Sequence, residues 1–186
     1  NAAVPTTEVI GDLTFSRYAQ ICVDARAGGV ASLTGNSITR SDYGTLFVSG
    51  DSLGSAAGPN VSQVKFTSPP ALTAGSLGTT GAPLVPWAAA DAGYLYYYGQ
   101  PVTYDVNGFR PLTASEYVVN AVTPNVNVFI TASNDMGAAD VTVKSLTMRP
   151  PANGNYWLTG SGSAKLTITD GVLVSGKSNQ EPNNFI

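Results

Sequence analysis

Few side chains in this sequence could do chemistry, and the missing ones exclude much of it. The 186 residues contain no histidine and a single cysteine, Cys22. A chain without histidine has no His-based catalytic triad, and zinc would lack its usual nitrogen ligands. Cys22 lies in the strand-like run Ala-Gln-Ile-Cys-Val. That setting predicts a small buried side chain rather than a reactive thiol.

The twelve acidic residues show no spacing typical of a catalytic pair. A glycosidase needs two carboxyl groups that face each other across a cleft. Here most of the candidates lie in or beside predicted loops, where Asp commonly forms turns or faces solvent. We therefore expect that the protein is not an enzyme.

One group of oxygen ligands has a pattern that calcium could use. Asn134, Asp135 and Asp140 bracket a glycine-containing loop between two predicted strands. Calcium binds oxygen ligands alone, but this loop lacks the twelve-residue spacing and the closing Glu of an EF-hand. A calcium site and an ordinary Asx-rich loop both remain open, and no other cofactor is expected.

Aromatic residues gather in one stretch of the chain. The candidate binding or interface residues are Trp87, Tyr94, Tyr96, Tyr98 and Tyr104. On a strand, the tyrosines at 94, 96 and 98 would share one face. An exposed row of this kind suits a protein interface or a stacking platform for sugar, whereas a buried row would belong to the core. All three interpretations remain open.

The composition indicates a surface made polar by uncharged groups. Only 11% of the residues are charged, against about 25% in typical globular proteins. The net charge is −3 with nine Lys and Arg, so we expect no direct contact with nucleic acid. No apolar run approaches the ~18 residues of a membrane span. This composition is typical of extracellular, phage and viral surface proteins, which predicts a virion or extracellular location.

Short runs of β-branched and aromatic residues, separated by Gly and Pro, predict many strands. The expected strands cover residues 10–24, 43–49, 61–67, 95–98, 101–106, 117–122, 126–132 and 141–148. Asp170-Gly171, between two alternating runs, predicts a two-residue hairpin over 165–174. Short helical turns are expected near 86–92 and 113–117, and 68–86 is expected to be a long functional or mobile loop.

Eight to ten strands without crossover helices predict an all-β fold, a single antiparallel β-sandwich of the jelly-roll type. We expect one domain over residues 1–186. Residues 1–12 would form an extended N-terminal arm able to add a strand to a neighbour's sheet, and residues 176–186 a loosely ordered tail. No internal repeat of useful period is found.

The segment Val126-Asn-Val-Phe-Ile-Thr-Ala-Ser-Asn-Asp135 resembles a late strand of jelly-roll capsid proteins from small picornavirus-like icosahedral viruses. Leu84-Val-Pro-Trp87 and the run Tyr94–Tyr98 are similar to segments of such proteins. The chain departs from them because it has no basic N-terminal arm and is shorter than many. The resemblance therefore implies a surface-facing or minor capsid subunit, and it carries over no functional residue.

These observations favour a structural subunit that assembles with copies of itself or with other structural subunits into a virus capsid or surface fibre, through Tyr-rich interfaces. The alternative is a secreted carbohydrate-binding or adhesion module that uses the Tyr and Trp side chains as a stacking platform. A bound glycan is a partner only in that alternative.

Overall fold

The computed structural model describes residues 5–25, 28–93, 99–149 and 156–175, and for residues 172–175 the backbone alone. The chain divides into two compact units. Unit 1 comprises residues 1–72 and 87–111, and unit 2 comprises residues 73–86 and 112–186. The single domain expected over residues 1–186 stays a prediction.

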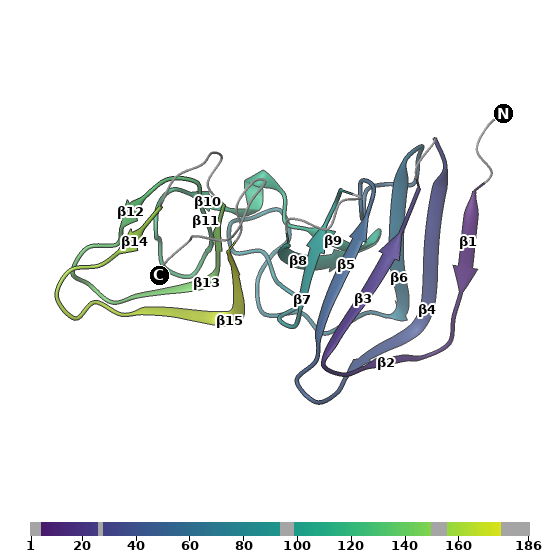
Figure 1. Cartoon of the computed structure of the whole chain (residues 1–186), viewed down its shortest axis with the longest axis horizontal. Coiled ribbons are helices and arrows are strands. Elements are labelled where there is room, and N and C mark those ends of the chain that lie inside the picture. The colour runs from purple at the N-terminus through teal and green to yellow at the C-terminus, as the bar shows by residue number, and fades with distance from the viewer. Residues whose placement is uncertain (1–4, 26–27, 94–98, 150–155, 176–186) are drawn as a thin grey trace. The chain divides into compact units, whose positions relative to one another are not determined.

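In the described part of unit 1 the structure has nine strands, labelled in Figure 1. They are β1 (Thr6–Val9), β2 (Leu13–Phe15), β3 (Tyr18–Val23), β4 (Val30–Arg40), β5 (Thr45–Gly50), β6 (Val61–Ser68), β7 (Ala88–Asp91), β8 (Gln100–Asp105) and β9 (Gly108–Pro111).

The first seven of these strands wind in parallel coils. β1 and β2 both pair with β4, and β3 pairs with β5. The next coil lies on this one in the same way, with β4 paired to β6 and β5 paired to β7. The hairpin β8–β9 then continues the second sheet with antiparallel pairing. Each coil is thus hydrogen-bonded to the coil that follows it in the chain.

Among its described residues, unit 2 has a short 3-10 helix and six strands. They are η1 (Ala114–Glu116), β10 (Val118–Val119), β11 (Asn127–Ile130), β12 (Asn134–Asp135), β13 (Val141–Met148), β14 (Leu158–Thr159) and β15 (Leu166–Ser175). β10, β11, β13 and β15 form one sheet in that order, all parallel, and β12 pairs in parallel with β14.

The all-β class is confirmed, but the pairing is not that of an antiparallel jelly roll. Nine of the eleven pairings between described strands are parallel. Strand alternation reports which face of a strand is buried and is the same for either pairing direction. The antiparallel expectation arose because parallel strands usually need a crossover of a dozen or more residues, commonly a helix. Here the connections are turns such as Ser41–Gly44 and longer segments without a helix, such as residues 51–60 and 69–87.

The longest strand, β4, was not expected from the sequence because Gly35 and Asn36 interrupt it. Glycine is depleted in strands unless another group approaches the backbone closely. A Cβ atom at position 35 would lie 2.5 Å from Cε1 of Phe66 on the neighbouring strand β6. Gly35 therefore leaves room for the Phe66 ring.

The hairpin predicted at Asp170-Gly171 is wrong. β15 runs through both residues and pairs with β13 on either side of them, with a register shift between Val143 and Ser145. A type I′ turn needs positive φ at both central residues, and only Gly171 has it, at 70°. The chain bends here instead of reversing.

The two predicted helical turns have different outcomes. Ala114–Glu116 is a 3-10 helix, and Oε2 of Glu116 accepts a hydrogen bond from the Thr113 backbone N–H at 2.8 Å, as in a capping box. The turn expected over 86–92 is instead strand β7. No helix in the described part of the chain is both long and apolar enough to cross a membrane.

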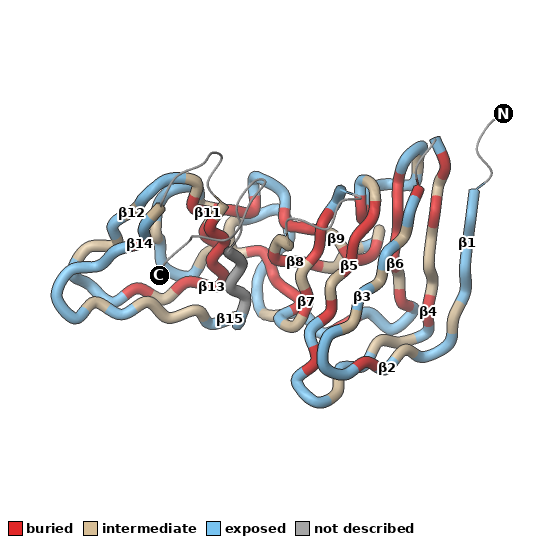
Figure 2. The backbone as a smooth tube through the Cα atoms, viewed as in Figure 1, coloured by how far each residue is buried: buried red, intermediate tan, exposed pale blue. Residues whose placement is uncertain are grey.

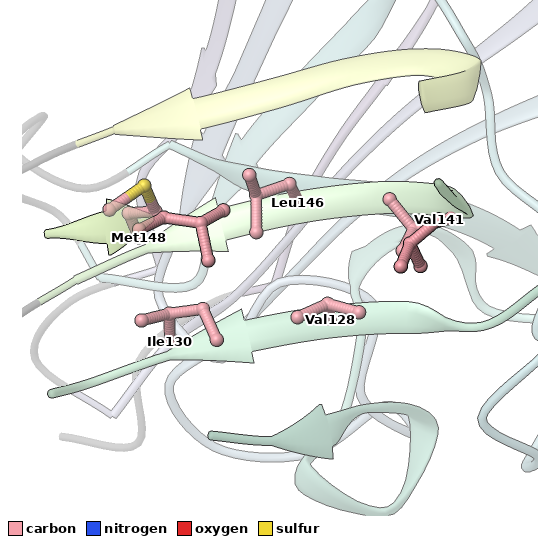
Figure 3. Packing of buried hydrophobic residues seen from close by; sticks show 7 residues of the cluster. Val128, Ile130, Val141, Leu146 and Met148 are labelled. Carbon is pink, nitrogen blue, oxygen red and sulfur yellow. The ribbon is translucent and has the colours of Figure 1, made fainter. Parts of the chain in front are cut away.

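The core of unit 2 is formed by apolar side chains of its parallel strands. Figure 3 shows Val128 and Ile130 of β11 beside Val141, Leu146 and Met148 of β13. All five are buried. Because β11 and β13 pair in register, Val128 opposite Leu146 and Ile130 opposite Met148, each coil stacks apolar side chains on those of the next.

Residues 73–86 are part of the segment 68–86 that was predicted to be a functional or mobile loop, and they belong to unit 2. Ala82, Leu84 and Val85 are fully buried. Nδ2 of Asn127 donates a hydrogen bond to the Ala82 carbonyl at 3.1 Å, and its Oδ1 accepts one from Ser145 at 2.9 Å. The segment is therefore packed and hydrogen-bonded as part of the unit.

A buried ion pair also contacts the start of this segment. Nζ of Lys144 lies 3.0 Å from Oδ2 of Asp170, and both side chains are about nine-tenths buried. Lys144 also donates to the Ala74 carbonyl, and the Thr73 hydroxyl donates to Asp170 at 2.6 Å. The ion pair thus joins β13 and β15 to the start of the segment.

Candidate assembly edge

The predicted aromatic patch is divided by the structure. Trp87 and Tyr104 belong to a packed cluster around Phe109, which is fully buried. The rings of Tyr104 and Trp87 meet that of Phe109 edge-on, at centroid distances of 5.1 and 6.4 Å. Tyr94, Tyr96 and Tyr98 lie outside the described residues, so the patch as a whole stays a prediction.

Tyr104 covers the outer side of β6. Its hydroxyl accepts a hydrogen bond from the Phe66 N–H at 2.6 Å and donates one to the Phe66 carbonyl at 3.1 Å. Burial raises the pKa of Tyr104 above its usual value near 10, so the phenol stays protonated and can donate this bond. One side chain therefore satisfies both backbone groups of an edge residue.

The β8–β9 hairpin lies over the same side of β6. Gly108, with a φ of 96°, comes so close that a Cβ atom there would lie 2.1 Å from the Val64 carbonyl oxygen. Together with Tyr104, this contact forms a cap on the β6 side of unit 1.

The first coil has no comparable cover among the described residues. β1 pairs only with β4, and β3 pairs only with β5, so one side of each strand has no described strand beside it. We call these outer sides of β1 and β3 the open edge. Figure 2 shows β1 as exposed throughout, in contrast to the buried positions along β6.

Apolar and aromatic side chains accompany this edge. Val9 at the end of β1 is 75% exposed, and Tyr18 at the start of β3 is 66% exposed. A strand edge presents N–H and C=O groups ready to pair with another strand, and proteins usually protect such edges with charge, proline or a cover. Pro5 precedes β1, and Glu8 is the one charged residue within β1 and β3, so most of the open edge can still accept an added strand.

A pocket of about 230 Å³ opens between β1, the end of β3 and β4. Glu8, Cys22 and Asp24 are among its lining residues. The pocket is thus a recess beside the open edge, with two acidic residues in its described lining.

Cys22 was predicted to be buried, and this prediction is wrong. Along β3, exposed and partly buried residues alternate, and Cys22 falls on the exposed side. Hydrophobic spacing alone gave no signal of this, because both faces of the strand carry apolar residues.

The residues predicted to bind calcium are engaged in separate backbone contacts. Oδ1 of Asp135 accepts from the Gly137 N–H at 2.9 Å, and Oδ1 of Asp140 accepts from the Lys165 N–H at 2.8 Å. Nδ2 of Asn134 donates to the Asn120 carbonyl at 2.7 Å. Across the ranges that the structure describes, no three His, Cys, Asp or Glu side chains are grouped to hold a metal ion. The calcium site remains a prediction.

Part of the predicted N-terminal arm has a defined place. Residues 6–9 form β1, an exposed strand on the chain's own sheet, while the predicted tail at 176–186 lies outside the described residues. The open edge itself was not expected from the sequence. The β-branched residues Thr6, Thr7, Val9 and Ile10 favour a strand, but they do not indicate its pairing partner.

No protein-family model matches this chain, and no significant match is found among curated proteins or solved structures.

Proposed function

We propose that the protein is a structural subunit that assembles through its open edge into a virus capsid or surface fibre, at a virion or extracellular surface. The observation that carries this proposal is the contrast within unit 1. The β6 side is covered by a hairpin and a tyrosine, whereas β1 and β3 have no described cover.

The partner that we favour is a second copy of the chain. Besides the open edge of unit 1, unit 2 has its own outer strand, β15, which pairs with β13 alone among the described strands. Two unlike edges on one chain permit head-to-tail contacts, which build open filaments when the rotation does not close a ring. Parallel coils thus favour a surface fibre over a shell of antiparallel jelly rolls.

This function needs contact area and backbone pairing, not proton transfer. It is consistent with a chain that has no histidine and few charged groups, and it does not require catalysis. In the glycan-binding alternative, Trp87 and Tyr104 are not available for stacking on a sugar, because they pack around Phe109. That platform would consist of the tyrosines at 94, 96 and 98, which lie outside the described residues.

The test places positive charge on the open edge. In the double variant Thr7→Lys, Val9→Lys, we expect assembly of the purified protein to weaken at least tenfold, because edge lysines oppose strand addition. The matched control is Val106→Lys, since Val106 is 87% exposed on the β8–β9 turn, away from this edge. Sedimentation velocity and negative-stain electron microscopy measure the result. Equal assembly of both variants, or a wild-type protein that stays monomeric at every concentration, would contradict the proposal.

A further inference from the structure

A four-residue turn in unit 1 has a side chain that the fold does not explain. Ser41–Gly44 joins β4 to β5, and Gly44 N–H donates to the Ser41 carbonyl at 2.9 Å. Asp42 and Tyr43 both have positive φ, 48° and 56°. This is the pattern of a type I′ turn, in which Asn or Asp followed by Gly is favoured.

Tyr43 occupies the position where glycine would be preferred. A non-glycine residue in this left-handed conformation costs about 1–2 kcal/mol. The tyrosine recovers little by packing, because it is 91% exposed. Backbone strain that burial of the side chain does not offset indicates selection for something other than stability.

The turn holds this ring in place. Arg40 lies over the Tyr43 ring, with Cζ 5.9 Å from the ring centroid, and its Nε donates to the Gly44 carbonyl at 2.7 Å. The backbone N–H of Ser41 donates to the Phe15 carbonyl of the previous coil at 2.8 Å. The Tyr43 ring is therefore exposed on a hydrogen-bonded turn, and one of its faces lies against the guanidinium of Arg40.

Two arginines and one aspartate belong to this corner. Arg17 lies on the adjacent coil, and its backbone is 3.1 Å from where a Gly44 Cβ would be. Both Arg17 and Arg40 are exposed, and neither forms an ion pair with a residue that the structure describes. Arg40 thus contacts the exposed ring, Arg17 joins the same corner through its backbone, and Asp42 adds one exposed carboxylate.

We propose that this corner binds a carboxylate-bearing sugar, with the ring of Tyr43 stacked on the apolar face of the pyranose and the guanidinium groups of Arg40 and Arg17 paired with the carboxylate. A guanidinium matches the geometry of a carboxylate, and an aromatic face supplies apolar contact area at low entropic cost. A stable protein interface would need about 1,000 Å² or more, and the residues on either side of Tyr43 in the sequence, Ser41, Asp42, Gly44 and Thr45, add no large apolar side chain to the ring.

The test is an array of uronate- and sialate-containing oligosaccharides, each beside its methyl-esterified counterpart. We expect the wild-type protein to bind the acids at least tenfold more than the esters. Tyr43→Gly should lose at least tenfold of this binding while its melting temperature stays the same or rises, because glycine relieves the backbone strain. Arg40→Gln should lose the preference for acid over ester, and Val106→Ala is the control that should change nothing.

Three results would overturn the proposal. They are equal binding to acids and esters, full binding by Tyr43→Gly, and loss of self-assembly instead of sugar binding in Tyr43→Gly, which would mark the corner as a protein contact. The corner contains neither Thr7 nor Val9, so the Thr7→Lys, Val9→Lys variant should still bind the acidic sugars. Failure of one proposal is thereby distinguished from failure of the other.

Discussion

At the scale of single residues, the cap on β6 depends on two positions whose contacts are unusually close. Gly108 and Tyr104 both come from the β8–β9 hairpin, and both meet the backbone of β6. Neither role can be predicted from local sequence, because the partner residues, Val64 and Phe66, are about forty positions away.

Gly108→Ala should destabilise the protein by about 3 kcal/mol or more, since the new methyl group would combine overpacking against the Val64 carbonyl with a strained positive φ. The control is Gly28→Ala in the same unit, where φ is also positive, at 81°, but no atom lies within 4 Å of the added Cβ. This control should cost only about 1 kcal/mol. Urea unfolding measures both, and equal losses would show that steric contact with β6 is absent.

Tyr104→Phe should cost about 1–3 kcal/mol, because it leaves the Phe66 N–H and carbonyl without their partner while keeping the ring contacts. The comparison is made by urea unfolding at pH 7. A loss below about 0.5 kcal/mol would mean that the hydroxyl does not satisfy these edge groups.

The pH dependence of stability should also change in Tyr104→Phe. Burial raises the pKa of Tyr104 in the folded state, so its contribution to stability is complete below the unfolded value near 10 and is lost as the pH rises through the folded pKa. The variant should lose less stability than wild type as the pH rises above about 10. Some alkaline loss should remain, because burial also raises the pKa of Tyr117.

At the scale of elements, the sequence predicted which segments are strands better than how they pair. Val141–Met148 was expected as a strand and is one, whereas β4 was missed because Gly35 looks like a breaker until Phe66 is seen beside it. The coil repeat was missed because the paired residues are unevenly spaced, such as Thr6 with Ala31 but Leu46 with Ala88. Bends and inserted segments of different length hide the period.

The candidate site was predictable only in part. An exposed N-terminal strand was expected, and β1 is exposed, but its pairing with β4 and the uncovered side of β3 follow from long-range register. The aromatic cluster was recognised by composition. Local sequence could not show that Trp87 and Tyr104 would pack on Phe109.

The ion pair between β13 and β15 gives a prediction for the element that it secures. Lys144→Met should destabilise unit 2 by about 3–5 kcal/mol, because Asp170 would remain mostly buried without its cation. The double variant Lys144→Met, Asp170→Leu should recover part of that loss. Protease cleavage within residues 73–86, beside urea unfolding, is the measurement. A single variant as resistant as wild type would show that the pair does not hold this segment.

At the scale of the whole molecule, the outer edges of the coils differ in how far they are covered. Unit 1 covers β6 and leaves β1 and β3 without a described neighbour, and unit 2 adds β15 as another outer strand. Solenoid-like folds need covered ends to stay soluble as single molecules. An edge without such a cover is therefore the natural place for another subunit.

Hydrogen–deuterium exchange of the wild-type protein, measured in dilute and in concentrated solution, tests this claim most directly. We predict that exchange in Thr6–Val9 and Tyr18–Val23 slows at least tenfold in concentrated solution, because added strands would bond the amides of the open edge. Exchange in Gly108–Pro111, on the capped side, should stay unchanged. Identical exchange of β1 and β3 at both concentrations would contradict the account.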